Sequence, residues 1–319
     1  MNKIDFWNSP WLQSVSAAVL LWLSFPPFDL GILQIPALVL LIRLSVISVS
    51  VRQMIYYAYP SFVLWNLLTT YWLMMASVPA GAAAILANAA LMLIPLGIIR
   101  RISRSDINPI GASIISAAIW VSYEFLHHQW DLAWPWLTLG NAWSNLTGVI
   151  QYISVTGVWG ISFWVMFTSA LVYHGIQTAS KPVYKSTLII FIAFPVFSVL
   201  AMVTVQQPSS EPFHVTVVQP NSDSYQRYGG HGSLEDLVTH LLEMTDDART
   251  DSTQLLVWPE NALDAALTLS SPQVIRVRDS LRAWNSDLLT GSGYLKYYSD
   301  SDLPDVFRRQ SSGSAYNFF

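Results

Sequence analysis

Long apolar runs separated by short polar stretches fill the first two thirds of this chain. A helix needs roughly 20 apolar residues to cross a bilayer, and all the runs except the first reach that length. The first run lacks the basic cluster and the small-residue cleavage site of a signal peptide, so we expect a retained span. The pattern therefore predicts seven membrane-spanning helices, near residues 11–25, 31–50, 54–77, 80–99, 109–128, 157–178 and 187–206.

After residue 206 the pattern changes to short apolar runs that alternate with amphipathic stretches. Helices are predicted to begin at Ser233, which has a capping partner in Asp236, and at Pro272. Gly291-Ser292-Gly293 is predicted to be a turn. The predicted strands are His214–Val218, Leu255–Trp258, Leu288–Thr290 and the stretch from Ser314 to Phe319. Strand–helix–strand order is typical of an α/β sheet, so we expect a membrane domain over residues 1–206 and a partial α/β domain over residues 207–319.

The charge distribution supports this division and orients the spans. Residues 1–206 hold eight Lys and Arg against five Asp and Glu, whereas residues 207–319 hold eight against fifteen. The connections 26–30, 78–79 and 129–156 contain no basic residue, and the alternate ones carry Lys3, Arg52, Arg100, Arg101, Arg104, Lys181 and Lys185. Since basic residues stay in the cytoplasm, we expect a cytoplasmic amino terminus and residues 207–319 on the outer side. No basic surface suggests nucleic acid as a partner.

A candidate catalytic residue follows the strand Leu255–Trp258. Pro259 cannot donate to a sheet ladder, so the strand must end there and present Glu260 at its carboxyl end. Catalytic groups in α/β folds tend to lie at such strand ends, although an ordinary solvated glutamate is the alternative. The chain contains no cysteine, which excludes disulfides, thiolate metal sites and thiol nucleophiles among these 319 residues.

A second group of candidates lies in and after the fifth predicted span. Glu124 is a carboxylate inside an apolar helix, where a functional role is the default hypothesis, and His127 and His128 are close enough in sequence to pair with it. The connection 129–156 is rich in tryptophan, including Trp134 and Trp136. These side chains indicate either an interfacial aromatic belt or a lipid-facing portal for an amphiphilic substrate.

These motifs together resemble the apolipoprotein N-acyltransferases, multi-pass bacterial enzymes with an extracytoplasmic nitrilase-like (carbon–nitrogen hydrolase) domain. The resemblance runs over nearly the whole chain. It includes Ser24–Phe28, Trp120–Trp136 with Glu124, and Gln151–Val172. The more specific matches are Trp258-Pro259-Glu260 after a strand and Tyr316-Asn317 near the end. Where the family commonly has a basic residue after the glutamate of the fifth span, this chain has His127-His128.

The resemblance implies a fold and a reaction. The fold is a multi-pass α-helical membrane domain followed by part of a nitrilase-like α-β-β-α domain. In the reaction, a Glu–Lys–Cys triad transfers an acyl chain from a phospholipid to the amino terminus of a diacylglyceryl-cysteine apolipoprotein, without a cofactor or a metal. Glu260 is carried over as the general base. Such an enzyme is expected in the bacterial inner membrane, acting as a monomer.

The other two triad members find no match. In the family the Lys and the Cys follow the Tyr-Asn strand, and this chain stops two residues after Asn317; Lys296 precedes Tyr316 and is expected on the surface. The chain is therefore expected to be an amino-terminal portion of the enzyme, inactive as it stands. The alternatives are a non-catalytic, membrane-anchored protein that binds lipid or lipoprotein, and, more weakly, a transporter that uses Glu124.

Overall fold

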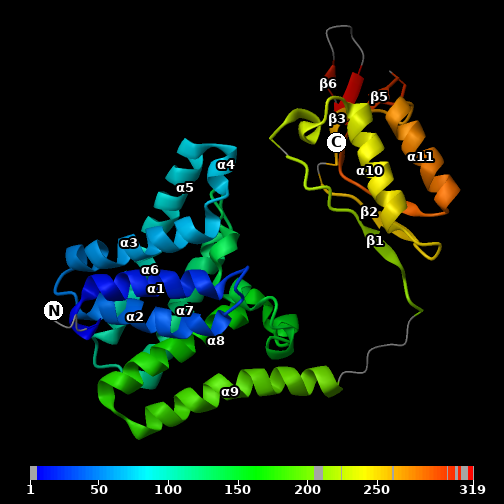
Figure 1. Cartoon of the computed structure of the whole chain (residues 1–319). Coiled ribbons are helices and arrows are strands. Elements are labelled where there is room, and N and C mark those ends of the chain that lie inside the picture. Colours follow the sequence, from blue (N-terminus) through cyan, green and yellow to red (C-terminus); the bar gives the residue numbers. More distant parts are fainter. Residues whose placement is uncertain are drawn as a thin grey trace, which may run out of the picture. The chain divides into compact units, whose positions relative to one another are not determined.

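The computed structural model describes residues 6–204, 211–223, 225–260, 262–299, 301–305, 308–309 and 315–318. The chain divides into two compact units, Met1–Gln207 and Pro208–Phe319, each with its own hydrophobic core (Figure 1).

The first unit is a bundle of helices. Each of the seven predicted apolar stretches is mostly helical over its described residues. In the described part of the chain, four segments are long and apolar enough to cross a membrane: Val78–Ser103, Pro109–His127, Ile153–Thr178 and Lys181–Thr204. In chain order the helices are α1 (Pro10–Ser24), α2 (Gln34–Ile47), α3 (Val51–Thr70), α4 (Leu73–Ala76), α5 (Val78–Leu91), α6 (Leu93–Ser103), α7 (Pro109–His127), α8 (Ile153–Thr178) and α9 (Lys181–Thr204). Short 3-10 helices at Pro135–Leu137, Leu139–Trp143 and Thr147–Val149 shape the connection between α7 and α8.

Several of these helices begin at side chains that cap their first turn. The Asn108 side chain accepts a hydrogen bond from the backbone N–H of Gly111 at 2.9 Å, and Pro109 occupies the first turn of α7. Ser50 caps α3 in the same way, through the N–H of Gln53 at 3.1 Å. Such caps satisfy donors that have no partner within the helix.

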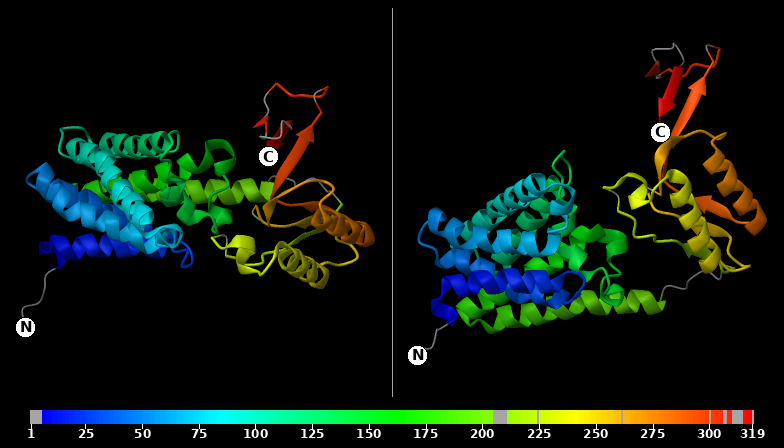
Figure 2. Two further views of the ribbon diagram at one scale, coloured as in Figure 1. Left: turned by 90° about the horizontal axis from the view of Figure 1, so that it is seen from above. Right: turned by 45° about the horizontal axis from the view of Figure 1, so that its top comes forward.

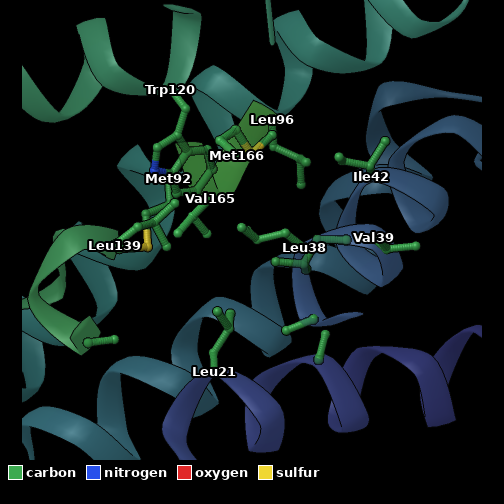
Figure 3. Close-up of a cluster of buried hydrophobic side chains, with 14 of the residues drawn as sticks. Leu21, Leu38, Val39, Ile42, Met92, Leu96, Trp120, Leu139, Val165 and Met166 are labelled. Carbon is green, nitrogen blue, oxygen red and sulfur yellow. The ribbon is translucent and has the colours of Figure 1, made fainter. Parts of the chain in front are cut away.

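The core of the bundle is continuous and apolar. Figure 3 shows a part of it, in which leucines of α1 and α2 lie in one cluster with Met92, between α5 and α6, Leu96 of α6 and Trp120 of α7. Leu139, which belongs to the connection between α7 and α8, lies in the same cluster and is fully buried. The connection is therefore packed into the bundle and is not a free surface loop.

Arg100 of α6 and Arg104, which directly follows α6, hold the carboxyl end of α2. Arg100 donates to the carbonyls of Ser45 and Ser48, both at 2.8 Å, and Arg104 donates to those of Val46 and Ser48, both at 3.1 Å. The last carbonyls of a helix lack partners within the helix and carry partial negative charge, so cations are favourable there. The ends of α2 and α6 therefore lie together.

In its described residues the second unit contains two groups of strands, two α-helices and a short 3-10 helix, Arg227–Gly230 (Figure 2). Strands β1 (Val215–Val217), β2 (Leu255–Val257) and β4 (Asp287–Leu289) form a parallel sheet in the order β1-β2-β4. A four-stranded sheet has the order β3-β5-β7-β6, and its strands are β3 (Leu263–Leu267), β5 (Ser292–Tyr298), β6 (Arg308–Arg309) and β7 (Ala315–Phe318). Helices α10 (Leu234–Ala248) and α11 (Pro272–Trp284) lie against each other and supply much of this unit's core (Figure 1).

The sequence predicted α10 and its cap correctly. The Ser233 hydroxyl accepts from the N–H of Asp236 at 3.1 Å, and the predicted apolar positions Leu237, Leu241 and Leu242 are buried. Helix α11 begins at Pro272 as predicted. The predicted last strand is present as Ala315–Phe318, whereas Ser314 and Phe319 fall outside the described residues.

The prediction for Gly291-Ser292-Gly293 was wrong. Ser292 begins β5, which pairs in parallel with β3 and antiparallel with β7. Strand β3 was also missed, since its sequence Leu-Asp-Ala-Ala-Leu has neither β-branched residues nor a strict alternation. Pairing between strands decides both segments, and a single sequence does not display it.

One face of the parallel sheet is apolar and exposed. Val215 and Val217 of β1 are 47% and 67% exposed, and Leu289 of β4 is 62% exposed. The intervening Leu256 is fully buried, so the opposite face packs on the core. Parallel sheets are usually covered on both faces, and exposed apolar patches are sites of association.

We expect an isolated fragment of residues 208–319 to self-associate through this face. Size-exclusion chromatography with light scattering over a concentration series measures it, with the double variant Val217→Thr and Leu289→Thr as control. The wild-type fragment should grow in mass with concentration, and the variant should do so much less. A fragment that stays monomeric, or a variant that associates equally, contradicts the role given to this face.

Candidate functional site

The end of β2 is held rigidly before the candidate glutamate. The N–H of Trp258 donates to the carbonyl of Leu289 at 2.9 Å, which continues the ladder by one residue. The Trp258 side chain is 4% exposed, and its Nε1–H donates to the Thr245 hydroxyl of α10 at 2.9 Å. Indole burial and this bond fix the strand end to the helix beneath it.

Pro259 and Gly291 fix the next peptide. The Pro259 carbonyl accepts from the N–H groups of Ala262 and Gly291, both at 3.2 Å. A Cβ placed on Gly291 would overlap the Glu260 carbonyl group and approach its Cα to 2.7 Å. Only glycine admits this close approach of two backbones. Gly291 therefore allows the segment after β4 to support Glu260.

The Glu260 side chain itself is exposed. Within the described part of the chain, it makes no hydrogen bond or ion pair, so its oxygens are available to accept a proton. Asn261, which follows it, lies outside the described residues. A carboxylate on a fixed strand end and open to solvent is suited to general base work, provided that a substrate and a nucleophile come within hydrogen-bond reach.

The other sequence candidates of this unit lie on β5 and β7. Lys296 is exposed, and its ammonium lies 4.9 Å from the centre of the Tyr298 ring. In the antiparallel pair Lys296 is opposite Asn317, and Tyr297 is opposite Tyr316. The side chains of Tyr316 and Asn317 fall outside the described residues.

Glu124 lies in the core of the first unit. Its side chain is 4% exposed, and Oε1 accepts two hydrogen bonds at 2.9 Å, from the indole N–H of Trp120 and from the backbone N–H of Leu139. Oε2 is buried without a partner among the described residues. Glu124 therefore links α7 to the connection that follows it.

The expected pairing of Glu124 with histidine is wrong. His127 Nε2 lies 3.0 Å from Asn88 Oδ1, while its Nδ1 accepts from the indole N–H of Trp130 at 2.9 Å. His128 Nε2 lies 3.0 Å from the hydroxyl of Thr138. Positions three and four residues apart share a helix face, yet each ring bonds to other partners, and Glu124 bonds to Trp120 and Leu139.

The tryptophans of the connection do not behave as one group. Trp134 and Trp143 are buried, whereas Trp130 and Trp136 are 45% and 44% exposed. Trp136 packs edge to face on Trp134 and on Trp72, with ring centres 5.4 and 5.3 Å apart. Only the exposed pair fits the belt or portal interpretations; Trp134 belongs to the core.

An apolar groove of about 660 Å³ runs beside α7. Its polar end is formed by Ser122, Tyr123, His127 and Trp130, and aliphatic residues of α6 and α7 line the remainder. Among the described residues, no group of three or more His, Cys, Asp or Glu is placed to hold a metal ion.

Sequence reasoning missed the residues that support the candidates. The sequence pattern predicts a turn at Gly291, and it gives no role to Gln34 or Ser162. Gln34 and Ser162 are polar residues at fully buried positions of α2 and α8, in segments predicted to lie in lipid. Buried polar residues in spans are expensive to place, and that cost was a usable signal.

These observations define the class of the protein: a helical membrane protein with a small α/β unit after its last apolar helix. Comparison with known proteins finds a matching family. Residues 17–171 are similar to the apolipoprotein N-acyltransferase N-terminal domain, which agrees with the resemblance predicted from the sequence.

Individual relatives extend the similarity into the second unit. The chain is 26% identical over 297 residues to an apolipoprotein N-acyltransferase of Chlorobaculum tepidum, which covers 89% of this chain and 55% of the relative. Relatives of the same name from Azotobacter vinelandii and Pseudomonas syringae are each 25% identical over 305 and 266 residues, or 88% and 79% of this chain. The chain spans about half the length of these relatives, 56% and 51% for the last two.

Proposed function

We propose that this chain is part of an enzyme that transfers an acyl chain from a phospholipid to the amino-terminal amine of a diacylglyceryl-cysteine apolipoprotein. The observation that carries the proposal is the similarity to relatives named for this activity, which covers 89% of the chain. A non-catalytic scaffold is less favoured because those relatives are named for catalysis. A transporter is less favoured because Glu124 already accepts two internal hydrogen bonds.

In this proposal Glu260 is the general base. It takes a proton from the nucleophile as the phospholipid ester is attacked, so that an acyl-enzyme forms and a lysophospholipid leaves. The lipoprotein amine then attacks the acyl carbonyl, the bond between the acyl group and the enzyme nucleophile breaks, and the proton that the amine loses returns to that nucleophile as the amide forms. The family's nucleophile is a cysteine, and its lysine stabilises the oxyanion. The 319 residues contain no cysteine, so they supply the base but not this nucleophile.

The proposed location is a bacterial inner membrane, with a cytoplasmic amino terminus and residues 207–319 in the periplasm. The positive-inside pattern of the connections supports this orientation. The bonds of Arg100 and Arg104 to the end of α2 also support it, because they bring two basic, predicted cytoplasmic ends together. The second unit is proposed to be the amino-terminal part of a nitrilase-like domain.

Lipoproteins from a strain without this gene test the proposal. Mass spectrometry of their amino-terminal cysteine should show two acyl chains, and restoring the gene should bring back the third. Restoring a copy of the gene that carries Glu260→Gln should leave the amino-terminal cysteine with two acyl chains. Three chains in the deletion strain, with no second gene of this family present, would contradict the proposed activity.

A further inference from the structure

Three helices converge on two consecutive peptide groups, 138–139 and 139–140, of the connection between α7 and α8. The N–H of Leu139 donates to Glu124 of α7 at 2.9 Å, and its carbonyl accepts from the side-chain amide of Gln34 of α2 at 3.0 Å. The N–H of Gly140 donates to the Ser162 hydroxyl of α8 at 3.0 Å. Glu124 is 4% exposed, and both Gln34 and Ser162 are completely buried. We call these three side chains the peptide clamp.

Packing around the peptide reinforces the clamp. Leu139 is fully buried and lies in the same cluster as Trp120 and Met92 (Figure 3). A Cβ on Gly140 would come within 2.7 Å of the Val158 carbonyl oxygen, so the connection runs directly against α8. The same Gln34 accepts from the Trp143 indole at 2.8 Å, which holds the connection four residues further on.

We propose that Glu124 is a positioning residue, which acts by accepting hydrogen bonds that hold the 134–143 segment in the bundle. Its Oε1 accepts hydrogen bonds from the N–H groups of Trp120 and Leu139 and so joins α7 to the segment. In this role Glu124 needs an oxygen that accepts both bonds and does not need a negative charge. The exposed Trp136 belongs to the same segment. If the proposed function is correct, the clamp fixes the lipid-facing surface past which an acyl donor enters, and Glu124 has no contact with the reacting atoms.

Two substitutions of Glu124 separate hydrogen bonding from charge. Glu124→Gln keeps an oxygen that accepts both N–H groups and removes the ionisable group. Glu124→Leu removes the acceptor and leaves a buried backbone donor without a partner, which is costly inside a protein. If Glu124 acts as part of the clamp, the Gln variant should keep the segment in place and the Leu variant should not. If Glu124 carries a proton, both variants should lose function.

These 319 residues contain no cysteine, so a thiol introduced among them, and identified by the mass of its own labelled peptide, reports a single position. Ala142→Cys places it in the clamped segment, where Ala142 is 2% exposed, and Ala170→Cys places a control in α8, where Ala170 is 1% exposed. The rate of maleimide labelling in lipid nanodiscs, without substrate, measures how often each site opens. With Leu at position 124 we expect labelling at 142 to accelerate about tenfold or more, and with Gln less than about twofold. Labelling at 170 should not change.

Three labelling results would overturn the proposal: equal acceleration with Gln and Leu, no acceleration with Leu, or equal acceleration at 142 and 170. The labelling needs no acyl transfer, so it succeeds or fails independently of the proposed function. The rate of acyl transfer by enzyme from native membranes is a second readout. The Glu124→Gln variant should keep a kcat close to that of the wild type, and the Glu124→Leu variant should not. A Gln variant that labels normally but lacks activity would assign Glu124 a chemical role and also overturn the proposal.

Discussion

Replacing Glu260 by Gln is expected to lower acyl transfer by roughly 10²–10⁴-fold, the usual contribution of a general base. The amide has nearly the same shape but cannot take up the proton of the nucleophile. Glu260 is exposed and without partners in the described part of the chain, so unfolding free energy should change by less than about 0.5 kcal/mol. The measurement is the initial rate of lipopeptide acylation by enzyme from native membranes.

Glu243→Gln is the matched control for this variant. Glu243 is an exposed glutamate of α10 and has no place in the proposed site, so its removal should leave the rate unchanged. Normal formation of the acyl-enzyme by Glu260→Gln would remove the general-base assignment, whatever happens in the later amide step.

Gly291→Ala is expected to be nearly as damaging, by displacing the glutamate instead of altering it. The new Cβ would overlap the Glu260 carbonyl group, so one of the two backbones must move. A displacement of about 1 Å at a catalytic group can cost on the order of 10²-fold in rate. We expect kcat to fall by about that factor while the KM for phospholipid changes little.

The neighbouring Ser292→Ala is the control for Gly291→Ala. Ser292 is exposed and its substitution removes an oxygen without adding volume, so both rate and thermal stability should be preserved. Activity of Gly291→Ala within about twofold of wild type would show that Glu260 does not need this support, since the usual loss from such misplacement is far larger.

The features that were predictable from sequence depend on local order. Helix α10 was predictable because Ser233 and Asp236 form its cap and its leucines recur at helical spacing. The helices of the first unit were predictable from the apolar runs. Inside lipid only helices and closed barrels satisfy all backbone hydrogen bonds, so a long apolar run indicates a helix. The strand before Glu260 was predictable from its apolar residues and the proline that ends it.

The features that were missed depend on contacts between distant parts of the chain. Gly291 touches a backbone 31 positions earlier, and a glycine that follows a short strand looks the same in sequence whether it makes a turn or supports a distant segment. The bond from Gln34 to Leu139 spans 105 positions. His127 and His128 looked like partners of Glu124 because they follow it by three and four residues, but their rings bond to residues of other segments, namely Asn88, Trp130 and Thr138.

The measurement that tests the central claim most directly is the intact mass of the protein from its native membrane after incubation with phospholipid and no acceptor. We predict a species heavier by one acyl chain, which returns to the starting mass when a diacylglyceryl-cysteine lipopeptide is added and the lipopeptide gains that chain. Glu260→Gln should not form the heavier species. An unchanged mass for the wild-type protein, together with an unmodified lipopeptide, would contradict the proposal that this membrane protein is an acyltransferase.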